Sequence, residues 1–154
     1  MTNLPSDVIH RLSGKTLVTA ESLTGGGIGA ALTSVSGASL VYKGGIISYV
    51  NEVKADVLGV PQEILGRYGA VSPWTAGFMA SGVRKLLKAD IAVSVTGLAG
   101  PGGDEFGHPV GTVYIGYDSV SESLVKEFHF QGDRESVRNQ TIEAALALIL
   151  EQNP

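Results

Sequence analysis

The chain has 154 residues, of which 44% are hydrophobic and 17% are charged, so it is long and apolar enough for one domain with a buried core. Its net charge of −4, with the basic residues scattered, argues against a general nucleic-acid binder. Because there is no cysteine, disulfide bonds, thiolate zinc sites and a cysteine nucleophile are excluded.

No segment of the sequence predicts export or membrane insertion. Residues 1–15 lack an apolar stretch long enough for a signal peptide. The longest apolar run, residues 144–150, is far shorter than the roughly 20 residues that a helix needs to cross a bilayer. We therefore expect a cytoplasmic protein that does not bind membranes.

Hydrophobic periodicity and turn residues predict helices that alternate with strands. In chain order these are a helix at 6–12, a strand at 16–20, a helix at 24–34, a strand at 46–49, helices at 52–58, 61–68 and 73–88, strands at 91–95, 111–117 and 124–130, and a helix at 134–151. Ser6, Asn51 and Asp133 are the expected caps of the first, third and last helices. The side chains expected to face inward from the helix at 73–88 are Phe78, Val83 and Leu86.

Two features of this pattern define the predicted sheet. The run at 91–95 is continuously apolar and rich in β-branched residues, which is typical of a central strand. The strands at 111–117 and 124–130 alternate apolar and polar residues on either side of a short turn, so we expect an antiparallel hairpin. Together the elements predict an α/β fold, a three-layer α/β/α sandwich with a mixed, mostly parallel sheet.

A polar turn follows the first predicted strand, in the segment Thr19–Gly27 (TAESLTGGG). Ser22 lies between that strand and the turn, close to the start of a helix. The free amides of a helix N-terminus, here around Thr24, Gly25 and Gly26, and its positive dipole end favour a developing oxyanion. Ser22 is therefore either a nucleophile or only the cap of the helix, and its spacing leaves both open.

Lys54 lies three residues past Asn51, in the first turn of a predicted helix that follows a strand. The helix dipole repels a charged lysine there, whereas a lysine that has to lose its proton gains from that field. A general base near neutrality needs a pKa well below the ordinary lysine value of about 10.4, and burial can supply part of that shift. Tyr49, five residues earlier, could relay a proton, hold a substrate or only form a hydrogen bond at the rim of a pocket.

A glycine-rich loop follows the predicted central strand, in the segment Thr96–Gly103 (TGLAGPGG). Its amides, with Thr96, Gly97 and Gly100 as the candidate residues, could form a concave site for a phosphate or a carbonyl oxygen. The segment is neither a P-loop nor a G-x-G-x-x-G fingerprint, which disfavours ATP hydrolysis and dinucleotide binding.

Charged residues in the second half of the chain offer two further candidate sites. Arg134 and Arg138 are four residues apart at the start of the last helix and share a face, so they could hold a phosphate or only pair with acidic neighbours on the surface. Asp104, Glu105 and His108 lie in a glycine-rich loop. Such side chains in a loop are more often solvated than bound to a metal, so we expect no metal site.

Several segments, in the same order along residues 17–147, resemble the C-terminal domain family of the competence/damage-inducible protein CinA. The matching segments are AESLTGG at 20–26, SYVNEVK at 48–54, YGAVS at 68–72, TGLAGPGG at 96–103, PVGTV at 109–113 and GDR at 132–134. Three residues depart mildly from the family pattern: Leu23 stands where many members have cysteine, and Val50 and Val53 replace smaller residues. Two-domain members also carry an N-terminal domain, which this sequence does not include.

The enzymatic members of that family are nicotinamide mononucleotide amidohydrolases, so the resemblance implies hydrolysis of this nucleotide to nicotinate mononucleotide and ammonia. It implies one amidohydrolase domain over residues 1–154, without a metal or organic cofactor, in which Ser22, Tyr49 and Lys54 are catalytic. The substrate-binding residues that we expect are Thr24, Gly25, Gly26, Asn51, Thr96, Gly97, Gly100, Arg134 and Arg138.

The resemblance favours an arginine as the phosphate ligand, and we favour Arg138 over Arg134 because it lies one turn further into the helix. The expected partner is a small-molecule nucleotide, and the sequence leaves a homo-oligomer open. The alternative function is a catalytically silent module of the same fold that binds a nucleotide or a protein.

Overall fold

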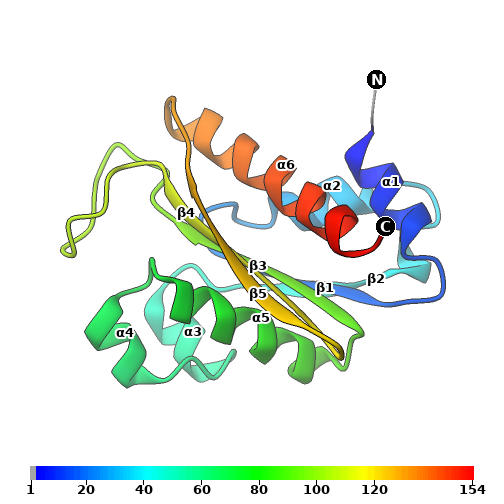
Figure 1. The fold of residues 1–154 in the computed structure, drawn as a ribbon, viewed down its shortest axis with the longest axis horizontal. Coiled ribbons are helices and arrows are strands. Elements are labelled where there is room, and N and C mark those ends of the chain that lie inside the picture. Colours follow the sequence, from blue (N-terminus) through cyan, green and yellow to red (C-terminus); the bar gives the residue numbers. More distant parts are fainter. Residues whose placement is uncertain (1–2) are drawn as a thin grey trace.

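A five-stranded mixed sheet lies between two layers of helices in the computed structural model, which describes residues 3–154 (Figure 1). The strands are β1 (Leu17–Glu21), β2 (Tyr42–Ile47), β3 (Ile91–Gly97), β4 (Thr112–Ser119) and β5 (Ser123–His129). The helices are α1 (Leu4–Arg11), α2 (Gly27–Thr33), α3 (Asn51–Asp56), α4 (Gln62–Tyr68), α5 (Pro73–Leu87) and α6 (Arg134–Gln152), with a 3-10 turn η1 at Ala38–Leu40. The predicted α/β class and three-layer arrangement are confirmed.

The order of the strands, β2-β1-β3-β4-β5, brings the ends of three parallel strands to one edge of the sheet. β1 pairs in parallel with β2 and with β3, and Glu21 lies opposite both Ile47 and Val95. Because these strands end in register, Ser22 and Ser48, the next residues after β1 and β2, lie close together. β4 and β5 continue the sheet as an antiparallel pair, which confirms the predicted hairpin.

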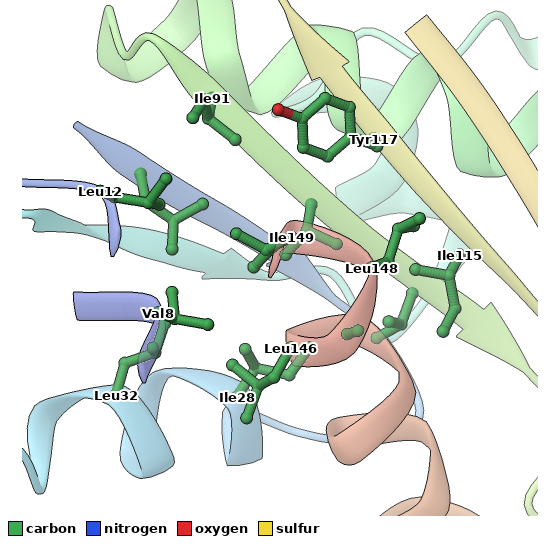
Figure 2. Close-up of a cluster of buried hydrophobic side chains, with 14 of the residues drawn as sticks. Val8, Leu12, Ile28, Leu32, Ile91, Ile115, Tyr117, Leu146, Leu148 and Ile149 are labelled. Carbon is green, nitrogen blue, oxygen red and sulfur yellow. The ribbon is translucent and has the colours of Figure 1, made fainter. Parts of the chain in front are cut away.

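The helices α1, α2 and α6 cover one face of the sheet, and α3, α4 and α5 cover the other (Figure 1). The larger apolar cluster lies between the sheet and the first group of helices. Side chains at its centre are Val8, Leu12, Ile28, Leu32, Ile91, Ile115, Tyr117, Leu146, Leu148 and Ile149 (Figure 2). A second cluster, which includes Val18, Met79, Val83 and Ala92, packs beneath α5. No helix within residues 3–154 is long and apolar enough to cross a membrane.

Two glycines allow close backbone contacts around α5. A side chain at Gly116 in β4 would meet the carbonyl oxygen of Ala76 at 2.6 Å, so α5 lies directly against the sheet. A side chain at Gly82 would collide with the carbonyl oxygen of Leu58, which precedes α4. Both positions require a residue without a Cβ atom.

The residues of α5 that face the sheet differ from those that the sequence pattern predicted. Ala76, Ala80 and Val83 are buried, and only the last of these is among the residues that the sequence pattern predicted to face inward. Phe78 and Leu86 are 40% and 48% exposed, so the expectation that they face inward is wrong. Met79 is also fully buried and Leu87 packs against the second cluster, so the inward stripe of α5 leaves Phe78 and Leu86 outside it.

Two elements begin three or more residues away from their predicted starts. β2 starts at Tyr42 rather than at residue 46, and its alternating burial is that of an edge strand. α2 starts at Gly27 rather than at residue 24, because Gly25 and Gly26 have φ angles of 58° and 99° and form a turn before the helix. Glycine adopts such angles without a steric penalty.

The caps of the helices are predicted with mixed success. The side chain of Asp133 accepts a hydrogen bond from the Ser136 amide, which confirms it as the cap of α6. Ser6 is not the cap of α1, because it donates its amide to the side chain of Asn3. Asn51 is not the cap of α3 either: it is the first residue of this helix, and the preceding valine occupies the cap position without a side-chain hydrogen bond.

Candidate active site

A cavity of about 620 Å³ opens at the edge of the sheet where β1, β2 and β3 end. Its lining residues are Ser22, Leu23, Tyr49, Asn51, Lys54, Ala70, Val71, Thr96, residues 97–106 and Arg134. They come from the ends of β1, β2 and β3 and the segments that follow them, which the parallel pairing brings together, from the segment between α4 and α5, and from the start of α6. The strand ends of an open α/β sheet are the usual place for a ligand site.

Lys54 is buried at this cavity, with 1% of its surface exposed. Its Nζ atom donates hydrogen bonds to Ser22 Oγ at 3.1 Å, to the Ser48 carbonyl oxygen at 2.6 Å and to the Tyr49 carbonyl oxygen at 3.3 Å. No carboxylate within residues 3–154 forms an ion pair with it. Burial lowers the pKa of Lys54 to about 8, so a useful fraction of the amine is neutral near pH 7.

The three oxygens around Nζ also orient the neutral form of the amine. A neutral amine has two N–H bonds and one lone pair. When the N–H bonds are donated to the carbonyl oxygens of Ser48 and Tyr49, the lone pair faces the hydroxyl of Ser22. Ser22 can then donate its proton to Lys54, which is the arrangement that a general base requires.

The start of α3 holds Lys54 in this inward position. The backbone amide of Lys54 donates to the Val50 carbonyl oxygen at 3.2 Å, and its own carbonyl oxygen accepts from the Val60 amide at 3.0 Å. The neighbouring Glu52 and Asp56 are exposed, so the inward face of this short helix carries the lysine. The sequence placed Lys54 in the first turn of a helix, but α3 has only six residues and Lys54 lies in its last turn. Its burial follows from the tertiary structure.

Glu21, which the sequence analysis did not single out, organises the turn that carries Ser22. Its carboxylate is 2% exposed and accepts from Thr24 Oγ1 at 2.6 Å, from the Ile28 amide at 2.8 Å and from the Gly29 amide at 3.0 Å. Glu21 thus accepts hydrogen bonds from the amides of the first turn of α2, while the hydroxyl of Ser22 forms a hydrogen bond with Lys54. A charged residue directly after the uncharged predicted strand at 16–20 was the available signal, since a carboxylate that becomes buried needs donors.

The amides of the turn after Ser22 are arranged differently from the expectation. The Gly25 amide donates to the Ser22 carbonyl oxygen at 3.1 Å, whereas the amides of Leu23 and Thr24 have no acceptor within residues 3–154. Leu23 lines the cavity, and Thr24, Gly25 and Gly26 do not. Of the turn residues, Leu23 is thus the one that combines a free amide with a place at the cavity.

Tyr49 and Arg134 meet at the rim of the cavity. The hydroxyl of Tyr49 accepts a hydrogen bond from Arg134 Nη2 at 3.0 Å, and Arg134 Nη1 donates to the Gly100 carbonyl oxygen at 2.7 Å. The ring of Tyr49 is exposed, and its hydroxyl forms no hydrogen bond with Ser22 or Lys54. Of the three residues that the resemblance implies to be catalytic, the structure joins two by side-chain contact and places the third at the rim.

Arg138 lies behind the serine turn rather than in the cavity. Its guanidinium donates to the carbonyl oxygens of Leu23 at 2.9 Å and of Thr24 at 3.2 Å, and it is not a lining residue. Arg134 is therefore the arginine of the predicted pair that faces the cavity, although Arg138 was favoured from the sequence.

The glycine-rich segment Thr96–Gly103 forms another wall of the cavity. Thr96 is buried and donates its hydroxyl to the Ala70 carbonyl oxygen at 2.7 Å, which ties the end of β3 to the segment before α5. A side chain at Gly97 would meet the Thr112 carbonyl oxygen at 2.6 Å, so the glycine keeps β3 and β4 close together. Gly100 and Asn51, two of the expected substrate-binding residues, also line the cavity.

A model of the CinA C-terminal domain matches residues 2–153, almost the whole chain. The chain belongs to the CinA C-terminal domain family. A relative from Halothermothrix orenii, named as a competence-damage inducible protein, is 48% identical over 147 residues, which make up 94% of this chain and 36% of the relative. The chain spans about a third of the length of the curated relatives that it matches.

Solved structures of CinA superfamily proteins share the fold of this chain. One from Klebsiella pneumoniae is 35% identical with a TM-score of 0.95, over 99% of this chain and 98% of that protein. The competence/damage inducible protein CihA from Agrobacterium tumefaciens is 36% identical with a TM-score of 0.92, over 100% of this chain and 98% of that protein. The family and the fold predicted from the sequence are thus confirmed.

In this CinA C-terminal domain, the loop that carries Asp104, Glu105 and His108 is organised by a hydrogen-bonded pair of side chains. His108 Nδ1 lies 2.6 Å from Asp104 Oδ2, and Asp104 also accepts from the amides of Phe106 and His108. Although partial burial raises it, the hydrogen bonds from His108 hold the pKa of Asp104 below its ordinary value. Within residues 3–154 no three histidine or carboxylate side chains are grouped closely enough to hold a metal ion.

Proposed function

We propose that this CinA C-terminal domain is an amidohydrolase that converts nicotinamide mononucleotide to nicotinate mononucleotide and ammonia. The observation that carries the proposal is the buried pair of Ser22 Oγ and Lys54 Nζ, 3.1 Å apart at the wall of a cavity. A hydroxyl beside an amine of lowered pKa is the pairing that activates a serine nucleophile. The choice of amide rests on the resemblance to the enzymatic members of the family.

In the first half of the proposed reaction, Ser22 Oγ attacks the carboxamide carbon while its proton passes to Lys54 Nζ. The carbonyl oxygen becomes an oxyanion, for which the free amide of Leu23 at the cavity is the candidate donor. The C–N bond then breaks, Lys54 gives its proton to the leaving nitrogen, and ammonia departs. The acyl group remains as an ester on Ser22.

In the second half, a water molecule attacks the ester carbon and gives a proton to Lys54. The bond to Ser22 Oγ breaks, the proton returns to this oxygen, and nicotinate mononucleotide leaves. One water is consumed, and both side chains regain their starting states. The two backbone carbonyls hold Nζ beside Ser22 Oγ in both halves, whether the nitrogen carries a lone pair or a third proton.

The size and charge of the cavity support a mononucleotide substrate. A volume of about 620 Å³ lies within the range of small-molecule sites. Arg134 lines the rim without a carboxylate partner within residues 3–154, so its charge is available to a phosphate. Such a charge-assisted contact contributes roughly 1.5–3 kcal/mol, or about ten- to a hundredfold in affinity.

The test is product analysis with the purified protein. Incubation with nicotinamide mononucleotide should yield ammonia and nicotinate mononucleotide in equal amounts, while the corresponding riboside, which lacks the phosphate, should be a poor substrate. If the nucleotide binds without any release of ammonia, the chain is a binding module and the proposed activity is wrong.

A further inference from the structure

The phenol of Tyr49 lies apart from the reacting pair. Its side chain is 57% exposed, and its hydroxyl accepts from Arg134 Nη2 at 3.0 Å. The contact between Tyr49 and Lys54 is made by the backbone carbonyl oxygen of the tyrosine instead, at 3.3 Å. Within residues 3–154 the phenol has no hydrogen bond that could carry a proton to Ser22 or Lys54.

Arg134 occupies an unusual place for a cation. It is the first residue of α6, where the dipole of a long helix disfavours positive charge. Its two acceptors, the carbonyl oxygen of Gly100 and the hydroxyl of Tyr49, are both neutral. A cation held by neutral groups at the mouth of a cavity can meet an anion there without first breaking an ion pair.

We propose that Tyr49 is a positioning residue that holds Arg134 for the phosphate group of a mononucleotide, rather than a proton donor in the reaction. Its hydroxyl fixes one end of the guanidinium while the Gly100 carbonyl fixes the other. The nucleotide's identity, though not the Tyr49–Arg134 contact, rests on the proposed function.

The geometry explains why a neutral hydroxyl suits this role. A guanidinium has five N–H donors in one plane, and the two hydrogen bonds at Nη1 and Nη2 use two of them. The remaining donors can bind phosphate oxygens in a plane already fixed across the rim. Fixing a flexible side chain before binding reduces the entropy lost when the ligand arrives. A carboxylate in place of the phenol would neutralise the arginine and compete with the phosphate.

The experiment combines Tyr49→Phe, Arg134→Ala and the double variant with two ligands that differ only by the phosphate. Binding of nicotinamide mononucleotide and of nicotinamide riboside is measured by calorimetry in the Ser22→Ala background, so that no turnover interferes. The matched controls are Tyr68→Phe and Arg67→Ala, which make the same changes at an exposed arginine and a stacked tyrosine outside the cavity lining. Thermal melting of each variant verifies folding.

We expect Tyr49→Phe to weaken nucleotide binding about three- to tenfold, because Arg134 keeps its charge but loses one hydrogen bond that orients it, and Arg134→Ala about ten- to a hundredfold. The double variant should bind no more weakly than Arg134→Ala, because the phenol acts through the arginine. Riboside binding should be unchanged in all three variants, and both controls should match the parent.

The same two single variants, with Ser22 intact, separate positioning from proton transfer. A positioning role predicts that Tyr49→Phe raises KM for the nucleotide and leaves kcat for nucleotide and riboside nearly unchanged. An equal loss of kcat on both substrates, losses that multiply in the double variant, or unchanged nucleotide binding in Tyr49→Phe would each overturn the inference. If the wild-type protein releases no ammonia, the proposed function fails, but the binding comparison still decides the role of Tyr49.

Discussion

The rate of amide hydrolysis should follow the deprotonation of Lys54. Burial lowers the pKa of this amine to about 8, and only the neutral form can accept the proton of Ser22. With this pKa, about a tenth of the lysine is neutral at pH 7 and about nine tenths at pH 9, so kcat/KM should rise about tenfold and then level off. A lysine with the ordinary pKa of about 10.4 would instead give a rise of about a hundredfold over the same interval, with no plateau.

The assay is initial ammonia release from nicotinamide mononucleotide between pH 6 and pH 10, at substrate concentrations well below KM. Asp104, the cavity carboxylate whose pKa lies below its ordinary value, stays ionised over this interval and does not contribute to the rise. Lys54→Arg is the matched control, since a guanidinium keeps the charge and cannot act as a base. It should be inactive at every pH, and its secondary structure is verified by circular dichroism.

Two results would refute this reasoning. A rate that stays flat from pH 7 to pH 9 would mean that no group of the free enzyme loses a required proton in that interval. Substantial activity of Lys54→Arg would mean that the lysine only supplies a charge to hold the substrate, and the base would have to be another group.

Three further predictions concern the surroundings of the pair. Between about pH 8 and pH 10.5 the unfolded chain binds the Lys54 proton and the folded protein does not. The wild type should therefore gain roughly 3 kcal/mol of stability relative to Lys54→Met as the pH rises through this interval. If urea unfolding shows the same difference in stability between the two proteins at every pH, the lowered pKa is wrong. Glu21→Gln should lower the free energy of unfolding by about 1–3 kcal/mol, because its amide group would face the donors at Ile28 and Gly29; an unchanged midpoint in urea would show that the carboxylate is dispensable. EDTA should leave ammonia release unchanged, and a loss that one divalent ion restores would replace the serine–lysine account with a metal mechanism.

Much of the site could be anticipated because its residues follow strands. Ser22 and Lys54 each come shortly after a predicted strand, and the carboxyl ends of parallel strands meet at one edge. The glycine-rich segment beginning at Thr96 follows the central strand and forms part of the same cavity. The order of the strands was not predicted, but any parallel arrangement would have brought these ends to the same side.

Other features depend on tertiary contacts that local patterns do not encode. Phe78 and Leu86 look like an inward stripe, yet the stripe of α5 that is buried runs through Ala76, Met79, Ala80 and Val83. The role of Glu21 depends on amides in the helix that follows the turn. Spacing along α6 also cannot decide which arginine reaches the cavity, because Arg138 is occupied by the carbonyls of the serine turn.

The central claim is that Ser22 and Lys54 together hydrolyse an amide, and one measurement addresses it directly. Ammonia release from nicotinamide mononucleotide is compared at pH 9 for the wild type, Ser22→Ala and Lys54→Arg, with binding of the nucleotide measured in each. Removing a hydroxyl whose partner is one buried amine should leave folding and binding nearly intact. The account predicts steady release by the wild type and none above background by either variant, while release by Ser22→Ala at more than a few per cent of the wild-type rate would contradict it.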